Sequence, residues 1–202
     1  LAVAFADEFG VERPLHVLAH DMLFTGAADP FFKRCGFLPA DREHAHAVLS
    51  AGSVTMVFPG GDYDTFRPTR AANRIDFAGR TGYVRTALRA GVPIVPVVSI
   101  GGQEAQYFLT RGEIIGRALH LEKLLRSKYF PISFGFPFGL VGAFPPNLPL
   151  PTKITTRVLD PIDPVETLGP DPDPAEVDEL VRGRMQDALD EMARERRFPV
   201  LG

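Results

Sequence analysis

The stretch that decides the fold is VFPGGDYDTFR at residues 57–67. It completes a β-branched and aromatic run, Val54–Phe58, which lies between Gly52 and Pro59. A short apolar run bounded in this way predicts a buried strand. The pair Gly60-Gly61 follows, and glycine lets the backbone adopt conformations closed to other residues and come close to a ligand. The stretch therefore predicts a buried strand that ends at an open binding edge.

Polar side chains come directly after this glycine pair. They are Asp62, Asp64 and Arg67. In open α/β sheets ligands bind beyond the carboxyl ends of the strands, so these side chains are candidates for contacting a ligand at this edge. The plain alternative is a glycine turn followed by solvated charges, and the spacing alone does not exclude it.

Strands and helices alternate on both sides of this stretch. The predicted strands are Leu15–Ala19, Phe37–Ala40, Val54–Phe58, Ile94–Ile100 and Lys153–Val158. The predicted helices are Ala2–Phe9, Pro30–Arg34, Asp41–Leu49 with Asp41 as N-cap, Phe77–Arg89, Ile114–Leu125, and Pro174–Arg197 with Asp173 as N-cap. Alternation of this kind favours parallel neighbours in a sheet. We expect an α/β fold, with a mixed, largely parallel sheet flanked by helices, in a single domain over residues 1–202.

Three segments lack a clear helix or strand pattern. Pro59–Asn73 predicts a loop, and Asp160–Pro174 is the best candidate for a flexible connection. Tyr129–Pro151 is aromatic and crowded with proline and glycine, and basic residues come just before it. This composition suits an acyl-chain channel or a membrane interface. It equally suits core packing beside a solvated helix face, and both interpretations stay open.

The composition, with 45% hydrophobic and 23% charged residues, is that of an ordinary globular domain. The net charge of -3 argues against a nucleic-acid partner, whose phosphates require a basic face. No apolar run reaches the roughly 20 residues of a spanning helix. The one cysteine, Cys35, cannot form an internal disulfide, which favours a reducing compartment.

The segment Phe58-Pro59-Gly60-Gly61 resembles the third conserved block of the glycerolipid acyltransferases. In the phosphate-accepting members that block reads Phe-Pro-Glu-Gly, followed by Thr and Arg. Here Gly60 stands where the Glu would be, and Tyr63 where the Arg would be. A Pro-Gly-Gly form followed by an acid, as at Asp64, is similar to the branch that acylates mono- and diacylglycerols. An acceptor without phosphate needs no arginine there, while Arg67 is still a candidate for an anionic group.

Further segments resemble the same family in the same order. Lys33–Arg42 is similar to the second block, and Gly91–Val97 to the fourth, which is an apolar strand carrying prolines. Because proline donates no ladder hydrogen bond, we expect Pro96 to mark an edge or a bend at the site. Other matching stretches are Arg74–Gly82, Pro149–Ile154 and Pro161–Asp163.

The resemblance implies a glycerol-phosphate-acyltransferase-like fold and an acyl-CoA-dependent O-acyltransferase of lipid metabolism. Its acceptor would be a lipid alcohol, either a mono- or diacylglycerol or a lysophospholipid. Acyl-CoA would be a co-substrate, with no cofactor and no metal. The implied location is cytoplasmic, peripheral to the inner face of the membrane. The implied substrate-binding residues are Phe58, Pro59, Gly60, Gly61, Asp64, Arg67 and Pro96.

In this family a histidine, four further residues and then an aspartate carry the chemistry. The histidine is the general base on the acceptor hydroxyl, and the aspartate orients and charges the imidazole. His16 and Asp21 have this spacing, but His16 falls in a predicted strand, whereas the family's pair lies at a loop-to-helix junction. We expect the catalytic pair upstream of Leu1, a chain truncated at its N-terminus, and no activity from these residues alone. On this view His16 is a strand residue and Asp21 a capping or turn residue.

Two other functions compete with transfer. A non-catalytic lipid-binding relative, or an inactive fragment, would keep the binding half without the His/Asp pair. A hydrolase is disfavoured because the sequence has no Gly-x-Ser-x-Gly elbow.

Overall fold

The computed structural model describes residues 2–10, 12–24, 26–121, 128–142 and 147–196. The chain forms two compact units. Unit 1 comprises Leu1–Pro59, Arg80–Ile94 and Pro161–Asp178. Unit 2 comprises Gly60–Gly79, Val95–Asp160 and Glu179–Gly202. Within unit 1 lies the parallel sheet expected from the sequence, and unit 2 is built on antiparallel pairs.

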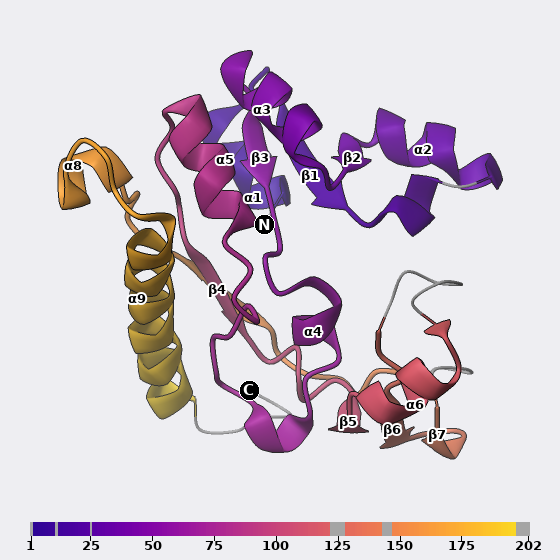
Figure 1. The fold of residues 1–202 in the computed structure, drawn as a ribbon. Helices are drawn as coiled ribbons and strands as arrows, with labels where there is room; N and C mark the ends of the chain where they lie inside the picture. Colours follow the sequence, from indigo (N-terminus) through magenta and orange to yellow (C-terminus); the bar gives the residue numbers. More distant parts are fainter. Residues whose placement is uncertain (1, 11, 25, 122–127, 143–146, 197–202) are drawn as a thin grey trace. The chain divides into compact units, whose positions relative to one another are not determined.

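Unit 1 is built around a three-stranded parallel sheet in the order β2-β1-β3 (Figure 1). The register aligns Val17 with both Phe37 and Met56, so these side chains form one row on one face of the sheet. The elements of this unit are α1 (Ala2–Phe9), β1 (Leu15–Ala19), η1 (Asp21–Phe24), η2 (Gly26–Ala28), α2 (Asp29–Arg34), β2 (Phe37–Pro39), α3 (Arg42–Ser50), β3 (Val54–Met56), α5 (Gly82–Ala90) and α8 (Pro164–Leu168).

Local signals explain how the chain returns between these strands. Asp41 caps α3 as predicted, because its carboxylate accepts a hydrogen bond of 2.9 Å from the His44 amide. Gly36 precedes β2 with φ of 83°, and a side chain there would come within 3.0 Å of the Leu15 carbonyl oxygen. The Gly36 carbonyl accepts a hydrogen bond from Val17. This close approach lets β2 pair with β1 from its own first residue, Phe37, which lies beside Val17.

Unit 2 contains two antiparallel sheets, β4-β8 and β5-β6-β7. The long helix α9 (Pro174–Glu195) begins in unit 1 and runs on through unit 2. The remaining elements are α4 (Gly61–Thr65), η3 (Thr69–Ala71), β4 (Val97–Ile100), β5 (Tyr107–Thr110), α6 (Glu113–Ala118), β6 (Ile132–Gly135), β7 (Gly139–Val141) and β8 (Thr155–Val158).

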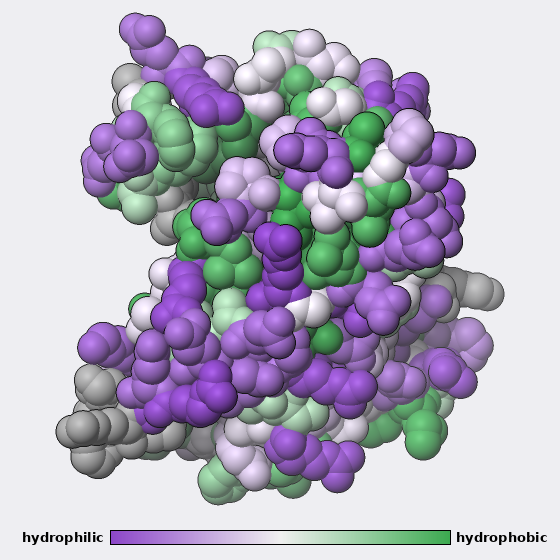
Figure 2. Space-filling view, turned by 90° about the vertical axis from the view of Figure 1, so that its left-hand side faces the viewer, coloured by the Kyte–Doolittle hydropathy of each residue, from purple (hydrophilic) through white to green (hydrophobic). Residues whose placement is uncertain are grey.

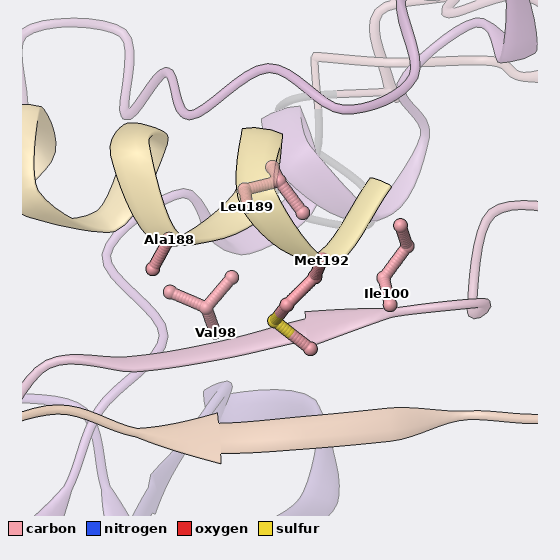
Figure 3. Packing of buried hydrophobic residues seen from close by; sticks show 5 residues of the cluster. All are labelled: Val98, Ile100, Ala188, Leu189 and Met192. Atoms are coloured by element: carbon pink, nitrogen blue, oxygen red, sulfur yellow. The ribbon is translucent and has the colours of Figure 1, made fainter. Parts of the chain in front are cut away.

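The core of unit 2 forms where α9 packs on β4 (Figure 3). It contains Val98, Ile100, Ala188, Leu189 and Met192, all nearly excluded from solvent. Burying each larger side chain stabilises the fold by roughly 1.5–3 kcal/mol. The opposite face of α9 is charged, and Figure 2, seen from the side on which α9 lies in Figure 1, is mainly hydrophilic there.

Several element predictions need correction. The helix expected from Phe77 begins only at Gly82, because Ala78 and Gly79 have positive φ and form a turn. The segment Pro59–Asn73, predicted as a loop, contains α4 and η3. The segment Asp160–Pro174, predicted as flexible, contains α8, whose N-cap Asp163 accepts from two backbone amides.

The aromatic segment Tyr129–Pro151 is also more regular than expected, since β6 and β7 pair within it. Strand β5 was not predicted at all. Only the first part of the predicted helix Ile114–Leu125 is observed, as α6, which ends at Ala118 with Leu119 as its C-cap; residues 122–127 lie outside the described part. None of the helices in the described part of the chain is long and apolar enough to cross a membrane.

Candidate functional site

A cavity of about 490 Å³ lies against the parallel sheet of unit 1. The aligned row Val17, Phe37 and Met56 forms its floor, and Phe5 and Ala6 of α1 also line it. The helix therefore covers this face of the sheet without filling it. The other lining residues are Gly10, Arg13, Pro14, Leu15, Cys35 and Phe58.

The lining of this cavity is predominantly apolar. Arg13 brings the one charged side chain of the lining set, and its guanidinium lies 5.6 Å from the centre of the Phe9 ring. The volume falls within the range of roughly 300–1,000 Å³ typical of small-molecule pockets. Phe58, the first residue of the decisive motif, lies at this cavity and is 64% exposed. The cavity is therefore suited to an aliphatic group rather than to a charged one.

The glycine pair of the motif serves a packing role in unit 2. Gly60 is buried, and a side chain there would come within 2.4 Å of the Asp64 Cβ. Gly60 thus lets the first turn of α4 close, with the Asp64 amide donating to the Gly60 carbonyl. Gly61 has φ of 50°, a conformation that favours glycine. Neither glycine is among the residues that line the cavity.

Arg67 is 2% exposed and makes its contacts inside unit 2. Its Nε donates to Asp64 Oδ1 over 3.1 Å, and its Nη2 forms a salt bridge with the same carboxylate. Nη2 also donates to the Asp76 carbonyl over 3.2 Å. The guanidinium therefore holds α4 to the chain that follows it. The expectation that Arg67 binds an anionic group stays a prediction; in this structure its guanidinium pairs with Asp64 and the Asp76 carbonyl.

Tyr63 and Asp76 complete the same cluster. The Tyr63 hydroxyl donates to Asp76 Oδ2 over 2.9 Å. The pKa of Asp76 is lowered, first because the Ala78 amide donates to its carboxylate and then through Tyr63 and the charges of Arg67 and Arg74, against the opposing effect of burial. Asp76 is thus held as a carboxylate.

Arg111, the residue after β5, also belongs to this cluster. Its Nε donates to the Tyr63 carbonyl over 2.8 Å, and its guanidinium carbon lies 3.8 Å from the centre of the Tyr63 ring. The Tyr129 ring lies 6.3 Å from the same ring. Sequence reasoning assigned no role to Tyr63 or Asp76, and it placed Arg111 only among the basic residues that come before the aromatic segment. Asp76 and Arg111 lie 13 and 48 residues from Tyr63, and no local pattern connects groups so far apart.

The comparison with known families decides what this arrangement belongs to. Residues 1–100 match the family model described as Acyltransferase. The chain belongs to the acyltransferase family. The matched residues include those that line the cavity, α4 and β4, together with Tyr63, Asp64, Arg67 and Asp76 of the polar cluster, whereas Arg111 lies beyond the match. The second half of the chain, with β5 to β8 and α9, lies outside the match.

The chain also has relatives among mycobacterial proteins. It is 35% identical to an uncharacterized protein of Mycobacterium bovis over 164 residues, which cover 80% of this chain and 43% of the relative. An uncharacterized protein of Mycobacterium tuberculosis matches to the same extent. One of Mycobacterium leprae is 32% identical, over 80% of the chain and 42% of the relative. The chain therefore spans less than half the length of these relatives. No solved structure matches it.

His16 is the second residue of β1 and lies beside Thr55 of β3. Because Leu15 and Val17 line the cavity and side chains alternate along a strand, His16 points to the opposite face of the sheet. Its Nδ1 and the Thr55 Oγ1 are buried without a hydrogen-bond partner among the described residues. Asp21 begins η1, and its side chain lies outside the described part. His16 is therefore a strand residue that faces away from the cavity, and no contact between its imidazole and Asp21 is described.

Pro96 is buried and comes immediately before β4. Its carbonyl accepts a hydrogen bond of 2.9 Å from the Leu159 amide. Pro96 thus extends the pairing between β4 and the chain after β8 through its carbonyl alone. At the start of a strand, the backbone N–H that proline lacks is not needed for the ladder.

Proposed function

We propose that this acyltransferase moves an acyl group from acyl-CoA to the hydroxyl of a lipid alcohol. The acceptor is a mono- or diacylglycerol or a lysophospholipid. In the reaction the acceptor oxygen attacks the thioester carbonyl, a C–O bond forms, the C–S bond breaks, and the hydroxyl proton ends on the CoA thiol. No cofactor is proposed, and the reaction takes place at the cytoplasmic face of the membrane.

One observation carries this proposal: the apolar cavity of a chain in the acyltransferase family reaches Phe58, the start of the motif that resembles the family's third block. An aliphatic group in this cavity gains roughly 0.8 kcal/mol for each CH₂ removed from water. A fatty acyl chain or a lipid acceptor satisfies this lining, whereas a polar acceptor does not. The internal pairing of Arg67 further favours an acceptor without phosphate.

The general base is assigned to the family's histidine rather than to His16, which faces away from the cavity. None of the residues that line the cavity is a histidine. A lipid-binding role without transfer is therefore the second candidate function for this chain. Asp64 and Arg67 are assigned to shaping the motif, and Phe58 and Pro59 to contacting the fatty substrate.

The experiment is a transfer assay with labelled palmitoyl-CoA and either monoacylglycerol, diacylglycerol or lysophospholipid dispersed in detergent. We expect label in the acylated lipid from the full-length protein. Absence of label in every lipid product, with acyl-CoA still bound in equilibrium dialysis, would favour the lipid-binding function. Absence of both binding and transfer would contradict both functions.

A further inference from the structure

The three-stranded sheet of unit 2 presents an apolar face to solvent. The strands β5, β6 and β7 lie side by side in Figure 1. Tyr107, Phe134 and Leu140 are register partners across the three strands, so their side chains point to the same side. Phe134 is 57% and Leu140 64% exposed. We call this surface, extended by Phe136 and Phe138 in the β6–β7 turn, the outward face.

The other side of the same sheet is packed within unit 2. Ser133 is buried, and the Phe108 ring makes an edge contact with Phe66 at 5.9 Å between ring centres. The inward side therefore already has its partners, and the apolar residues of the outward face are not needed to fill the core.

A buried amide holds the turn that carries the two outward phenylalanines. Asn147 is 5% exposed. Its Oδ1 accepts from the Phe138 amide over 3.2 Å, and its Nδ2 donates to the Gly139 carbonyl over 3.0 Å. The Leu148 amide adds a bond of 2.8 Å to the Phe136 carbonyl. These bonds fix the backbone on both sides of Pro137 while Phe136 stays 71% exposed.

The charged residues in the segment that contains β6, β7 and β8 are all basic. Residues 123–159 contain no acidic residue, and their basic residues are Lys123, Arg126, Lys128, Lys153 and Arg157. Arg157 is paired with Glu191 of α9, and Lys123 and Arg126 lie outside the described residues. Four of the five residues of the outward face, all but Tyr107, lie in this segment. Aromatic side chains beside basic residues suit an anionic bilayer, which takes aromatic side chains into its headgroup region and attracts cations. Soluble monomers rarely expose an apolar surface of this kind without a partner.

We propose that the outward face is a membrane-docking surface, with Phe136 and Phe138 entering the boundary between headgroups and acyl chains of an anionic membrane. This proposal depends on the proposed function in one respect: the lipid substrate is the reason for choosing a bilayer as the partner. It is measured without catalysis, so a failure of docking and a failure of acyl transfer are separate results.

The absence of tryptophan from the chain allows a direct test. In Phe136→Trp the single indole reports the polarity around the turn. With vesicles of phosphatidylcholine and phosphatidylglycerol we expect a blue shift of the emission, quenching by brominated acyl chains, and a smaller effect with phosphatidylcholine alone. Emission that stays at its aqueous wavelength while the protein sediments with the vesicles would overturn the assignment of this face.

A loss-of-binding series completes the test. Phe136→Ser is expected to weaken the vesicle partition coefficient by about tenfold or more, because an aromatic side chain no longer leaves water. Phe31→Ser is the matched control, since Phe31 of α2 is 65% exposed and belongs to unit 1; its partition coefficient should not change. Equal losses in both variants would contradict the proposal. So would a dimer in sedimentation velocity that Phe136→Ser dissolves, because a second copy would then cover the face.

Discussion

The parallel sheet of unit 1 and the antiparallel β5-β6-β7 sheet of unit 2 differ in whether their apolar rows are covered. In unit 1 a helix covers the row Val17, Phe37 and Met56, and a cavity is left beneath it. In unit 2 the row Tyr107, Phe134 and Leu140 is left open to solvent. Antiparallel sheets commonly expose one face, but that face is normally polar. This contrast underlies the two proposals, that the hollow against the first sheet takes an aliphatic group and that the outward face of the second docks on a membrane.

The largest expected effect is on the free energy of unfolding, when leucine is replaced by alanine in the core. The same substitution on the outward face is the comparison. Leu189→Ala removes a side chain that is 4% exposed in the α9–β4 core, and we expect the free energy of unfolding to fall by about 3 kcal/mol. Leu140→Ala on the outward face should change it by no more than about 0.5 kcal/mol. Urea unfolding followed by circular dichroism measures both. A large loss from Leu140→Ala would mean that the outward face belongs to the core.

A smaller effect is expected at the polar cluster of α4. Arg67→Met keeps an apolar stem but leaves the Asp64 carboxylate and the Asp76 carbonyl without their donor. We expect a loss of about 2 kcal/mol in the free energy of unfolding, limited because Asp64 is half exposed. Arg89→Met, which breaks the exposed pair with Glu43, is the control and should cost less than about 1 kcal/mol. Equal losses of unfolding free energy in the two variants would show that the Arg67–Asp64 pair stabilises the fold no more than an exposed surface pair does.

The smallest effect is a pH dependence carried by Asp76. Its pKa is lower in the folded protein than its ordinary value of 3.8, so the unfolded state binds the proton more tightly. The stabilisation is complete above the ordinary value and is lost as the pH falls through the lower, folded value. We expect Asp76→Asn to reduce the slope of stability against pH in this acidic range. An unchanged slope would show that Asp76 does not contribute to the loss of stability at acidic pH.

These two sheets also differ in how well the sequence predicted them. The strands of unit 1 were predicted because each is a short apolar run with glycine, proline or a helix cap beside it, as at Asp41 and Gly52. In unit 2, Pro137 and the surrounding glycines interrupt the alternation that identifies a strand. The pairing of Tyr107 with Phe134 depends on a distant segment, as does the contact of Arg111 with Tyr63.

In the candidate site, too, the sequence predicted some features and missed others. Phe58 was predicted at the edge of a binding region and lies at the cavity. The functions assigned to Gly60, Gly61 and Asp64 as substrate contacts stay predictions, while their packing roles within α4 are visible. The anion-binding role of Arg67 also stays a prediction, and the sequence around Arg67 gave no sign that the Asp76 carbonyl lies beside it.

The central claim is that the cavity of unit 1 holds a fatty acyl chain, and the single cysteine tests it directly. Cys35 is free and lines this cavity, so its alkylation rate by N-ethylmaleimide reports occupancy. We predict that palmitoyl-CoA slows alkylation, whereas CoA without an acyl chain leaves the rate unchanged. An alkylation rate that stays the same at saturating palmitoyl-CoA would contradict the claim.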